Sequence, residues 1–374
     1  MLDGLMKMGV TPVVFVPNRE GIFSELEKRG IPVFAFTFRM YTYSHTETLT
    51  QKLLFIPRMV AKVMSNQRAI NALVPILKKH KIDIVHTNVG PVNVGFRASR
   101  RLGIPHVYHL REYGKKDFGM CYFPRWKNFY EQFETDNSYS ICITRDIQAY
   151  HQQQGKSTSV VIYNGICTEN DKIPLITGSK DYFLFAGRLE AAKGVDSMLE
   201  AYSLYVDRTT HPLPLRVAGS IANSIYVERL KSIVVTHHIQ AYVEFLGDCL
   251  NVDELMRGAR ATIIPSLHEA FGRVMPEAMM QGCLCIGRNT SGTKEQLDNG
   301  LRLTGEEIGL RYSTAEELAE WLEKVGEAPQ EQFRPYTERA FKVVNQLYTK
   351  ENNSKQIYEF YQEILNGQGT HGIN

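Results

Sequence analysis

Length, composition and charge already restrict what this chain can be. Its 374 residues are enough for two domains, and 43% hydrophobic and 22% charged residues are ordinary for a water-soluble globular protein. The formal net charge of only +3 gives no basis for a nucleic-acid-binding protein that works through bulk charge.

The N-terminal half alternates helical segments with short apolar strands, which is typical of a parallel α/β sheet. Residues 113–125, rich in aromatic and charged side chains, are expected to form a loop. The expected helices cover residues 2–8, 22–29, 48–80, 95–102, 126–135 and 146–153. The expected strands cover residues 12–17, 31–38, 82–86, 104–109, 140–144 and 159–163.

The long helical stretch at residues 48–80 mixes apolar and basic side chains, and prolines at 57 and 75 are expected to kink or divide it. One interpretation is an apolar stripe that faces the core, with a solvated cationic face. The other is a surface that sits on anionic lipid head groups. The sequence leaves both open.

Three ionisable residues fall at the carboxyl end of the strand at 104–109. They are His109, Arg111 and Glu112, and in open α/β sheets ligands bind outside the carboxyl ends of the strands. A single histidine at such a place is more often structural. The cluster leaves a structural and a catalytic role equally open.

A polar segment at residues 168–180 separates this half from a second α/β series, and we interpret it as an interdomain linker. Two successive series predict two doubly wound domains that face each other across a cleft. The expected strands of the second series cover residues 182–186, 214–218, 243–246, 261–264 and 283–286. The expected helices cover residues 195–206, 226–235, 252–257, 275–281, 316–324, 333–348 and 353–365.

Residues 261–287 form the unit of the second series with most potential for ligand binding. A buried strand leads into a loop and then a helix that starts near Pro276, which suits the first helical turn. Glu269 lies in the loop and Glu277 at the helix start. The alternative is that Glu277 only complements the helix dipole and Glu269 is solvated.

Another strand end carries two cations, Arg188 and Lys193, in the sequence Gly187-Arg-Leu-Glu-Ala-Ala-Lys193-Gly194. Each alone would be a surface charge. Together with the loop around Glu269, they predict a clamp for a diphosphate. Sequences for a dinucleotide-binding GxGxxG turn, a phosphate loop or an Asp-x-Asp metal pair are missing, so we expect no metal and no resident cofactor.

These segments resemble the retaining, nucleotide-sugar-dependent glycosyltransferases of the GT-B fold, specifically the group that includes bacterial capsular and lipopolysaccharide transferases. In the second half, the resemblance rests on FAGRLEAAKG (185–194), VAGS (217–220), EFLG (244–247) and PSLHEAFGRVMPEAMMQG (265–282). In the first half, it rests on HTN (86–88), IPHVYHLRE (104–112) and VIYNGI (161–166). It covers nearly the whole chain.

The resemblance implies a role for each residue that matches a motif. Arg188 and Lys193 would neutralise the donor diphosphate, Glu269 and His109 would contact the donor sugar, and Glu277 would bind the ribose hydroxyls. The remaining contacts to the donor, which is most often a UDP-sugar in this family, would come from Gly187, Gly219, Leu246, Gly247, Ala270, Phe271 and Gly272. The implied acceptor is a glycan or a lipid-linked molecule.

The resemblance also sets the expected domains. Residues 1–167 would bind the acceptor, residues 178–350 would bind the donor, and the C-terminal helix at 353–366 would pack back onto the first domain. Family members open with a strand and a glycine-rich loop, whereas Met1 falls inside the expected first helix. We therefore expect that this strand and this loop are missing.

Three functions remain as hypotheses. The first is a retaining glycosyltransferase of cell-surface polysaccharide synthesis, cytoplasmic or peripheral on the inner membrane face. The N-terminus lacks the features of a signal peptide, no run is long enough to span a membrane, and the six cysteines suggest no disulfide framework. The second is a weakly active or inactive donor-binding subunit that needs a partner. The third is another nucleotide-sugar enzyme such as an epimerase.

Overall fold

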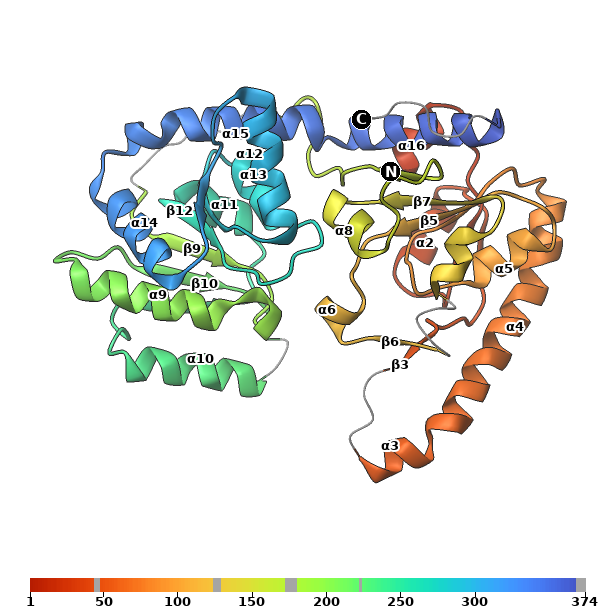
Figure 1. Ribbon diagram of the computed structural model, residues 1–374, viewed down its shortest axis with the longest axis horizontal. Coiled ribbons are helices and arrows are strands. Elements are labelled where there is room, and N and C mark those ends of the chain that lie inside the picture. The colour runs from red at the N-terminus through yellow and green to blue at the C-terminus, as the bar shows by residue number, and fades with distance from the viewer. Residues whose placement is uncertain (44–47, 124–128, 172–179, 222–223, 368–374) are drawn as a thin grey trace. The chain divides into compact units, whose positions relative to one another are not determined.

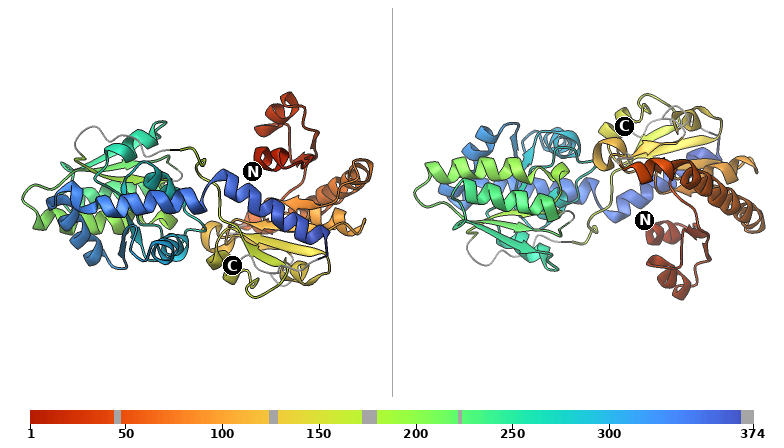
Figure 2. Two further views of the ribbon diagram at one scale, coloured as in Figure 1. Left: turned by 90° about the horizontal axis from the view of Figure 1, so that it is seen from above. Right: turned by 90° about the horizontal axis from the view of Figure 1, so that it is seen from below.

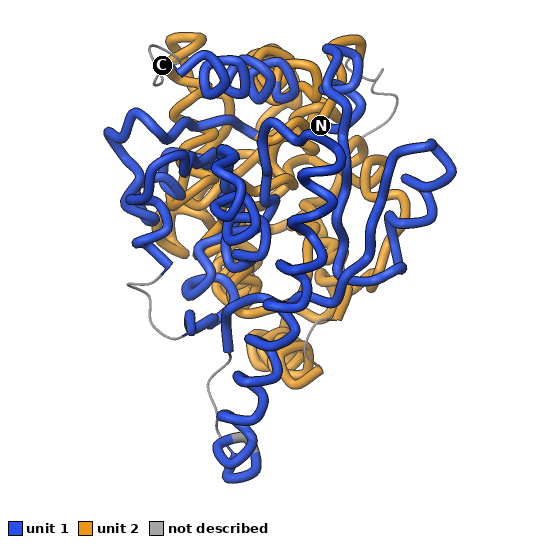
Figure 3. Tube along the Cα trace, turned by 90° about the vertical axis from the view of Figure 1, so that its right-hand side faces the viewer, with its two compact units in different colours: residues 1–163, 353–374 blue, residues 164–352 orange. Residues whose placement is uncertain are grey.

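The chain consists of two compact units, shown separately coloured in Figure 3. This computed structural model describes residues 1–43, 48–123, 129–171, 180–221 and 224–367. Unit 1 comprises residues 1–163 and 353–374, and unit 2 comprises residues 164–352. The sequence places the corresponding boundaries at 167, 178 and 353.

Unit 2 is built on a six-stranded sheet in the order β11-β10-β9-β12-β13-β14, with all neighbours parallel. Counted along the chain, this is the order 3-2-1-4-5-6 of a doubly wound nucleotide-binding sheet. The predicted α/β class with parallel sheets is confirmed. The strands are β9 (Phe183–Ala186), β10 (Leu215–Ala218), β11 (Val243–Gly247), β12 (Ala261–Ile264), β13 (Leu284–Arg288) and β14 (Leu310–Tyr312).

Helices connect the strands of unit 2, and α9 and α10 lie side by side (Figure 2). Apolar side chains of α9, α10 and α14 pack with those of the strands into one core. The helices are α9 (Val195–Arg208), α10 (Ser224–Thr236), α11 (Val252–Gly258), α12 (Val274–Met280), α13 (Ser291–Thr304), α14 (Ala315–Glu327) and α15 (Arg334–Leu347), and the 3-10 turns are η2 (Ala191–Lys193) and η3 (Gln330–Phe333).

Unit 1 contains a four-stranded parallel sheet in the order β4-β5-β7-β8, a separate parallel pair β1-β2, and an antiparallel pair β3-β6. The sequence predicts a loop at 113–125, of which residues 124 and 125 lie outside the described residues; the rest also contains the short helix α6 (Lys115–Phe118) and strand β6. The strands are β1 (Val14–Val16), β2 (Val33–Ala35), β3 (Thr42–Tyr43), β4 (Val85–Thr87), β5 (His106–Leu110), β6 (Cys121–Tyr122), β7 (Ser138–Cys142) and β8 (Ser159–Val161).

The helix expected at 48–80 is divided at Leu54, and Pro57 lies in the first turn of the longer part, where it leaves no hydrogen bond unmade. The helix expected at 126–135 falls partly outside the described residues, and its end is the 3-10 turn η1 (Glu131–Glu134). The helices of unit 1 are α1 (Leu2–Lys7), α2 (Ile22–Lys28), α3 (Leu49–Leu53), α4 (Phe55–Lys79), α5 (Val94–Arg100), α6 (Lys115–Phe118) and α8 (Arg145–Tyr150).

The C-terminal helix α16 (Lys350–Leu365) completes the core of unit 1. Its buried residues Ile357, Phe360 and Ile364 pack in one cluster with β5, β7 and Leu5 of α1. A Cβ atom on Gly4 would lie 2.2 Å from the hydroxyl oxygen of Ser354, so α1 and α16 are in close contact. None of the described helices is both long and apolar enough to cross a bilayer.

Candidate functional site

The predicted donor residues of unit 2 lie where the strand order of its sheet reverses, between β9 and β12. Strands β9 and β12 are neighbours, and the chain winds away from them toward opposite edges of the sheet (Figure 1). Arg188 follows β9 and Glu269 follows β12, so both lie at the carboxyl ends of these two strands. Doubly wound sheets bind ligands in the crevice outside this switch point.

Backbone hydrogen bonds donated by two glycines hold three neighbouring strand ends together. Gly187 donates to the carbonyl of Ala218 at 3.0 Å, and Gly219 donates to the carbonyl of Gly247 at 2.8 Å. A Cβ atom on Gly219 would lie 1.8 Å from the carbonyl oxygen of Gly187, a distance that no side chain tolerates. The predicted residues Gly187, Gly219, Leu246 and Gly247 therefore lie at adjacent ends of β9, β10 and β11.

The loops that follow β9 and β12 are in contact. Gly194 has a φ of +66°, and a Cβ atom there would lie 2.3 Å from the carbonyl oxygen of Pro265. Leu267 donates its N–H to the carbonyl of Ala192 at 3.0 Å. The positive φ and the close approach to Pro265 both need a residue without a side chain at 194, which explains the glycine after Lys193.

The same contact joins two residues that the sequence assigned to different parts of the donor. The Nζ of Lys193 lies 2.7 Å from Oε2 of Glu269, and the two side chains are only 20% and 18% exposed. Without a ligand, the predicted phosphate cation and the predicted sugar carboxylate neutralise each other. A shielded ion pair holds each partner in a fixed orientation.

The backbone of residues 269–272 is fixed from the neighbouring helix α13. Gly292 donates its N–H to the carbonyl of Glu269 at 2.8 Å, and the side-chain amide of Gln296 donates to the carbonyl of Phe271 at 2.5 Å. Gly272 has a φ of +79°, which favours glycine. Ala270 and Phe271 complete this turn, and sequence reasoning missed both α13 and Gln296.

Arg188 and Glu277, the other two charged residues of the predicted donor site, each form an ion pair with a residue nearby in the sequence. Arg188 Nη2 lies 2.9 Å from Oε1 of Glu190, and its side chain is 52% exposed. Glu277, in the first turn of α12, pairs with Arg273 at 3.0 Å. Burial raises the pKa of Glu277, and the nearby charge of Arg273 lowers it. The i, i+4 spacing of Arg273 and Glu277 was the one signal that could have identified this pair.

His109 belongs to unit 1, inside β5, and is completely buried. Its Nδ1 lies 3.1 Å from Nε2 of His86 and 3.4 Å from Nη2 of Arg111. Burial, and then the charge of Arg111, lowers the pKa of His109 well below its usual value. His109 is therefore neutral at physiological pH.

Glu112, the third member of the predicted cluster, has different partners from His109. Its Oε1 accepts a hydrogen bond from the N–H of Gly90 at 2.9 Å, and its carbonyl lies 2.8 Å from Nε2 of His151. Burial raises the pKa of Glu112 to about 7, against the opposing effect of the Gly90 hydrogen bond. This carboxyl titrates near physiological pH, and the sequence alone gave no sign of that.

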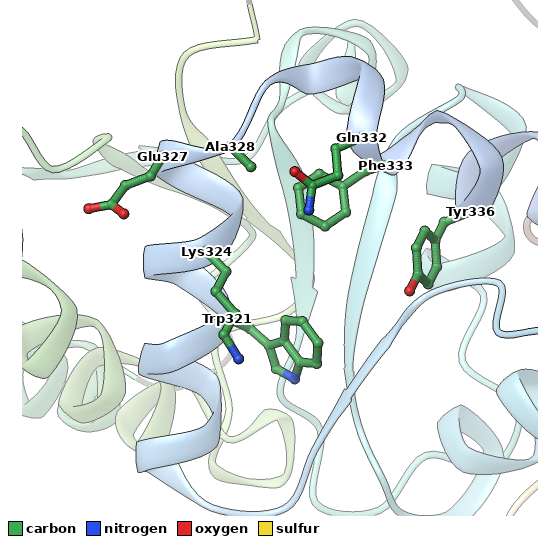
Figure 4. Close-up of a pocket in the computed structure, with 7 residues that line it drawn as sticks. All are labelled: Trp321, Lys324, Glu327, Ala328, Gln332, Phe333 and Tyr336. Atoms are coloured by element: carbon green, nitrogen blue, oxygen red, sulfur yellow. The ribbon is translucent and has the colours of Figure 1, made fainter.

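Other features of the described residues do not belong to the predicted donor site. No three His, Cys, Asp or Glu side chains in the described part of the chain are grouped as metal ligands. One pocket of unit 2 lies at α14, η3 and α15 and contains no predicted site residue (Figure 4). It is lined by Trp321, Lys324, Glu327, Ala328, Gln332, Phe333 and Tyr336.

Two family descriptions together cover most of the chain. Residues 168–342 match "Glycosyl transferases group 1" and residues 1–170 match "Glycosyltransferase Family 4". An uncharacterized glycosyltransferase of Methanocaldococcus jannaschii is 25% identical over 79% of this chain and 82% of its own. The N-acetyl-alpha-D-glucosaminyl L-malate synthase of Bacillus anthracis is 26% identical over 51% of this chain and 47% of its own.

Solved glycosyltransferase structures match nearly the whole chain. The structure of Anabaena HepE with UDP and glucose has a TM-score of 0.71 at 20% identity, over 97% of this chain and 95% of that one. A glycosyltransferase from Rickettsia africae has a TM-score of 0.72 at 16% identity, over 97% and 94% of the two chains.

Proposed function

This chain belongs to the glycosyl transferases of group 1 and has their GT-B fold, and on that premise we propose that it is a retaining transferase that uses a UDP-sugar. The observation that carries the proposal is the meeting of the Arg188–Lys193 loop with the Glu269 loop at the switch point of unit 2. The complexes of HepE with UDP, with UDP and glucose, and with UDP-glucose support the choice of donor.

In this proposal the charged residues divide the donor between them. Lys193 and Arg188 neutralise the diphosphate, and Glu277 accepts hydrogen bonds from the ribose hydroxyls. Glu269 accepts hydrogen bonds from hydroxyls of the donor sugar. The ion pair of Lys193 and Glu269 thus holds both residues ready for the phosphate and the sugar, which are adjacent groups of one molecule.

Transfer then proceeds on one face of the sugar. The bond between C1 and the β-phosphate oxygen breaks, and its electron pair stays on the diphosphate. The acceptor hydroxyl oxygen bonds to C1 from the same face, and its proton passes to a phosphate oxygen. Arg188 and Lys193 stabilise the charge that develops on the leaving diphosphate, so the proposed reaction needs no metal.

The proposal is tested by assaying donor hydrolysis and sugar transfer from UDP-glucose and related UDP-sugars. The Arg188→Ala/Lys193→Ala double variant should lose two to three orders of magnitude in turnover, roughly the effect of removing a charge-stabilising donor. A matched Arg229→Ala/Lys231→Ala variant removes the same charge from the exposed face of α10 and should keep wild-type turnover.

Three results would count against this assignment or part of it. Equal turnover in the two double variants would exclude the cation pair from the reaction. NMR of the first-formed anomer, showing inverted configuration, would exclude retention. Binding of UDP with no turnover on any UDP-sugar would favour the alternative function, a donor-binding subunit that needs a partner.

We further propose that the acceptor is a glycan or lipid-linked molecule presented at an anionic membrane surface, with α3 and the first half of α4 as the contact. This end of α4 projects from the rest of unit 1 (Figure 1). The second half of α4 packs its apolar residues into the core, whereas Met59 is the one buried apolar residue among the described residues of the first half. Exposed apolar side chains there are Leu49, Leu53, Leu54, Ile56, Val60, Val63 and Met64, interspersed with the exposed basic residues Lys52, Arg58 and Arg68.

Flotation with vesicles tests this contact. The wild-type protein should float with vesicles that contain anionic phospholipid and float less with neutral ones, because apolar insertion and charge attraction act together. A Leu53→Asp/Ile56→Asp variant should stay at the bottom of the gradient. A Val235→Asp variant, altered on an exposed residue of α10, should float as wild type does. Equal flotation of all three proteins would refute the contact.

A further inference from the structure

A chain of polar side chains runs through the interior of unit 1, from the C-terminal helix to the end of β5. The hydroxyl of Tyr361 on α16 lies 2.6 Å from Nδ1 of His86 on β4. The Nε2 of His86 lies 3.1 Å from Nδ1 of His109, and Nη2 of Arg111 lies 3.4 Å from that same Nδ1. Four residues that are far apart in the sequence therefore form one connected chain.

The direction of each hydrogen bond follows from which groups can donate. Burial raises the pKa of Tyr361, so its hydroxyl keeps its proton. Burial and the charge of Arg111 lower the pKa of His86 to about 3, so its ring is neutral and carries one proton. If the Tyr361 hydroxyl donates to Nδ1 of His86, that proton lies on Nε2.

The other end of the chain requires the same arrangement. The guanidinium of Arg111 can only donate, so the Nδ1 of His109 beside it must be an acceptor. A proton on this Nδ1 would also face the positive charge of Arg111. With Nδ1 accepting from both His86 and Arg111, the single proton of His109 lies on Nε2.

The Nε2 of His109 is shielded from solvent and has no hydrogen-bond partner among the described residues. A buried donor without an acceptor is costly to a fold. Such a cost is offset when a ligand oxygen accepts the hydrogen bond, and His109 is the residue that the sequence assigned to a sugar.

We propose that Tyr361, His86 and Arg111 are positioning residues that together hold His109 in its Nε2–H form, so that His109 gives a hydrogen bond to a substrate oxygen and takes no proton from the acceptor. That the oxygen belongs to a sugar rests on the proposed function. The tautomer itself does not rest on it, because it follows from contacts within unit 1.

The ring nitrogens of histidine report the tautomer directly, because protonated and unprotonated nitrogens differ widely in 15N chemical shift. In 15N-histidine-labelled wild-type protein, assigned with His86→Gln and His109→Gln variants, both rings should carry the proton on Nε2. A Tyr361→Phe variant should show mixed tautomers at His86, whereas the guanidinium of Arg111 still keeps the proton of His109 on Nε2. Tyr358→Phe, which removes a hydroxyl from the same helix outside this chain, should leave the wild-type spectrum.

The steady-state kinetics of the same variants provide a second test. Tyr361→Phe should lower kcat roughly two- to tenfold, the usual effect of one hydrogen bond, with UDP affinity unchanged. A proton on Nδ1 of His109 in the wild type, or identical spectra of Tyr361→Phe and Tyr358→Phe, would overturn the proposal. A wild-type protein that shows the Nε2–H tautomers but transfers no sugar would instead contradict the proposed function alone.

Discussion

At the scale of single residues, the charged side chains of the predicted donor site are paired with opposite charges and do not stand alone. Lys193 neutralises Glu269, and Arg273 neutralises Glu277, so the predicted carboxylates of the donor site are paired before any ligand binds. A ligand with a diphosphate and several hydroxyls offers alternative partners to both members of the first pair. Binding would then exchange one set of charge-assisted hydrogen bonds for another, at a lower cost than uncovering a bare charge.

Glu112 yields a prediction about pH. Because its pKa in the folded protein, about 7, is above that of an unfolded glutamate, folding binds a proton between pH 4.5 and 7. The stability that this carboxyl contributes is complete below pH 4.5 and is lost as pH rises through 7. The loss is of the order of 3 kcal/mol.

A Glu112→Gln variant keeps an acceptor for the Gly90 N–H but has no charge to bury. The free energy of unfolding of Glu112→Gln minus that of wild type, measured in urea, should increase from pH 4.5 to pH 8. The same difference for the exposed Glu359→Gln control should not change with pH. The buried histidines, whose lowered pKa values destabilise the fold at acid pH, are present in both proteins, so their contribution cancels when the variant is compared with wild type. If the difference in free energy of unfolding between Glu112→Gln and wild type did not change with pH, the pKa of Glu112 would not be raised.

Some residues of the site can be recognised from the sequence next to them, and others cannot. Arg188, Lys193 and Glu269 were found because each lies in the segment that directly follows a strand, and Glu277 because it lies at the start of the next helix. Gln296, His86 and Tyr361 were missed, because their relevance arises only from contacts made by folding. Tyr361 and its partner His86 are 275 positions apart in the chain.

At the scale of elements, strand and helix patterns predicted most of the fold because buried parallel strands are short apolar runs between helical segments. Helix α13 was missed because its buried face carries Gly292, Thr293, Gln296, Asn299 and Gly300 beside a single Leu297, which hides the apolar period. Strands β3 and β6 were missed because two-residue strands leave no pattern.

The approach of β9 and β10 at Gly219 can be tested by substitution. Gly219→Ala should cost about 3 kcal/mol or more in the free energy of unfolding, because the new Cβ would overlap the carbonyl oxygen of Gly187 and backbone must move. Gly305→Ala has open space around it and only a strained φ of +75°, so it should cost about 1–2 kcal/mol. Urea denaturation compares the two, and equal costs would refute the steric account.

At the scale of the whole molecule, the last helix returns the chain to the core of unit 1, after unit 2 has been completed. Phe360, fully buried among residues of β5, β7 and α1, should cost about 3–5 kcal/mol when changed to alanine. Hydrogen exchange should then show lost protection in β5 and β7 but not in β9. The exposed Leu365→Ala serves as the control, and a loss of protection spread evenly over both units would contradict this assignment.

The proposed function depends above all on the switch point of the unit 2 sheet, which should bind a nucleoside diphosphate through Arg188 and Lys193. Calorimetric titration of the whole chain with UDP tests this binding most directly. We predict that the wild type binds UDP and that Arg188→Ala/Lys193→Ala binds at least about a hundredfold more weakly, since each charged hydrogen bond contributes about 1.5–3 kcal/mol. The Arg229→Ala/Lys231→Ala variant should bind as wild type does. Equal affinity of the two double variants for UDP would contradict this role of Arg188 and Lys193.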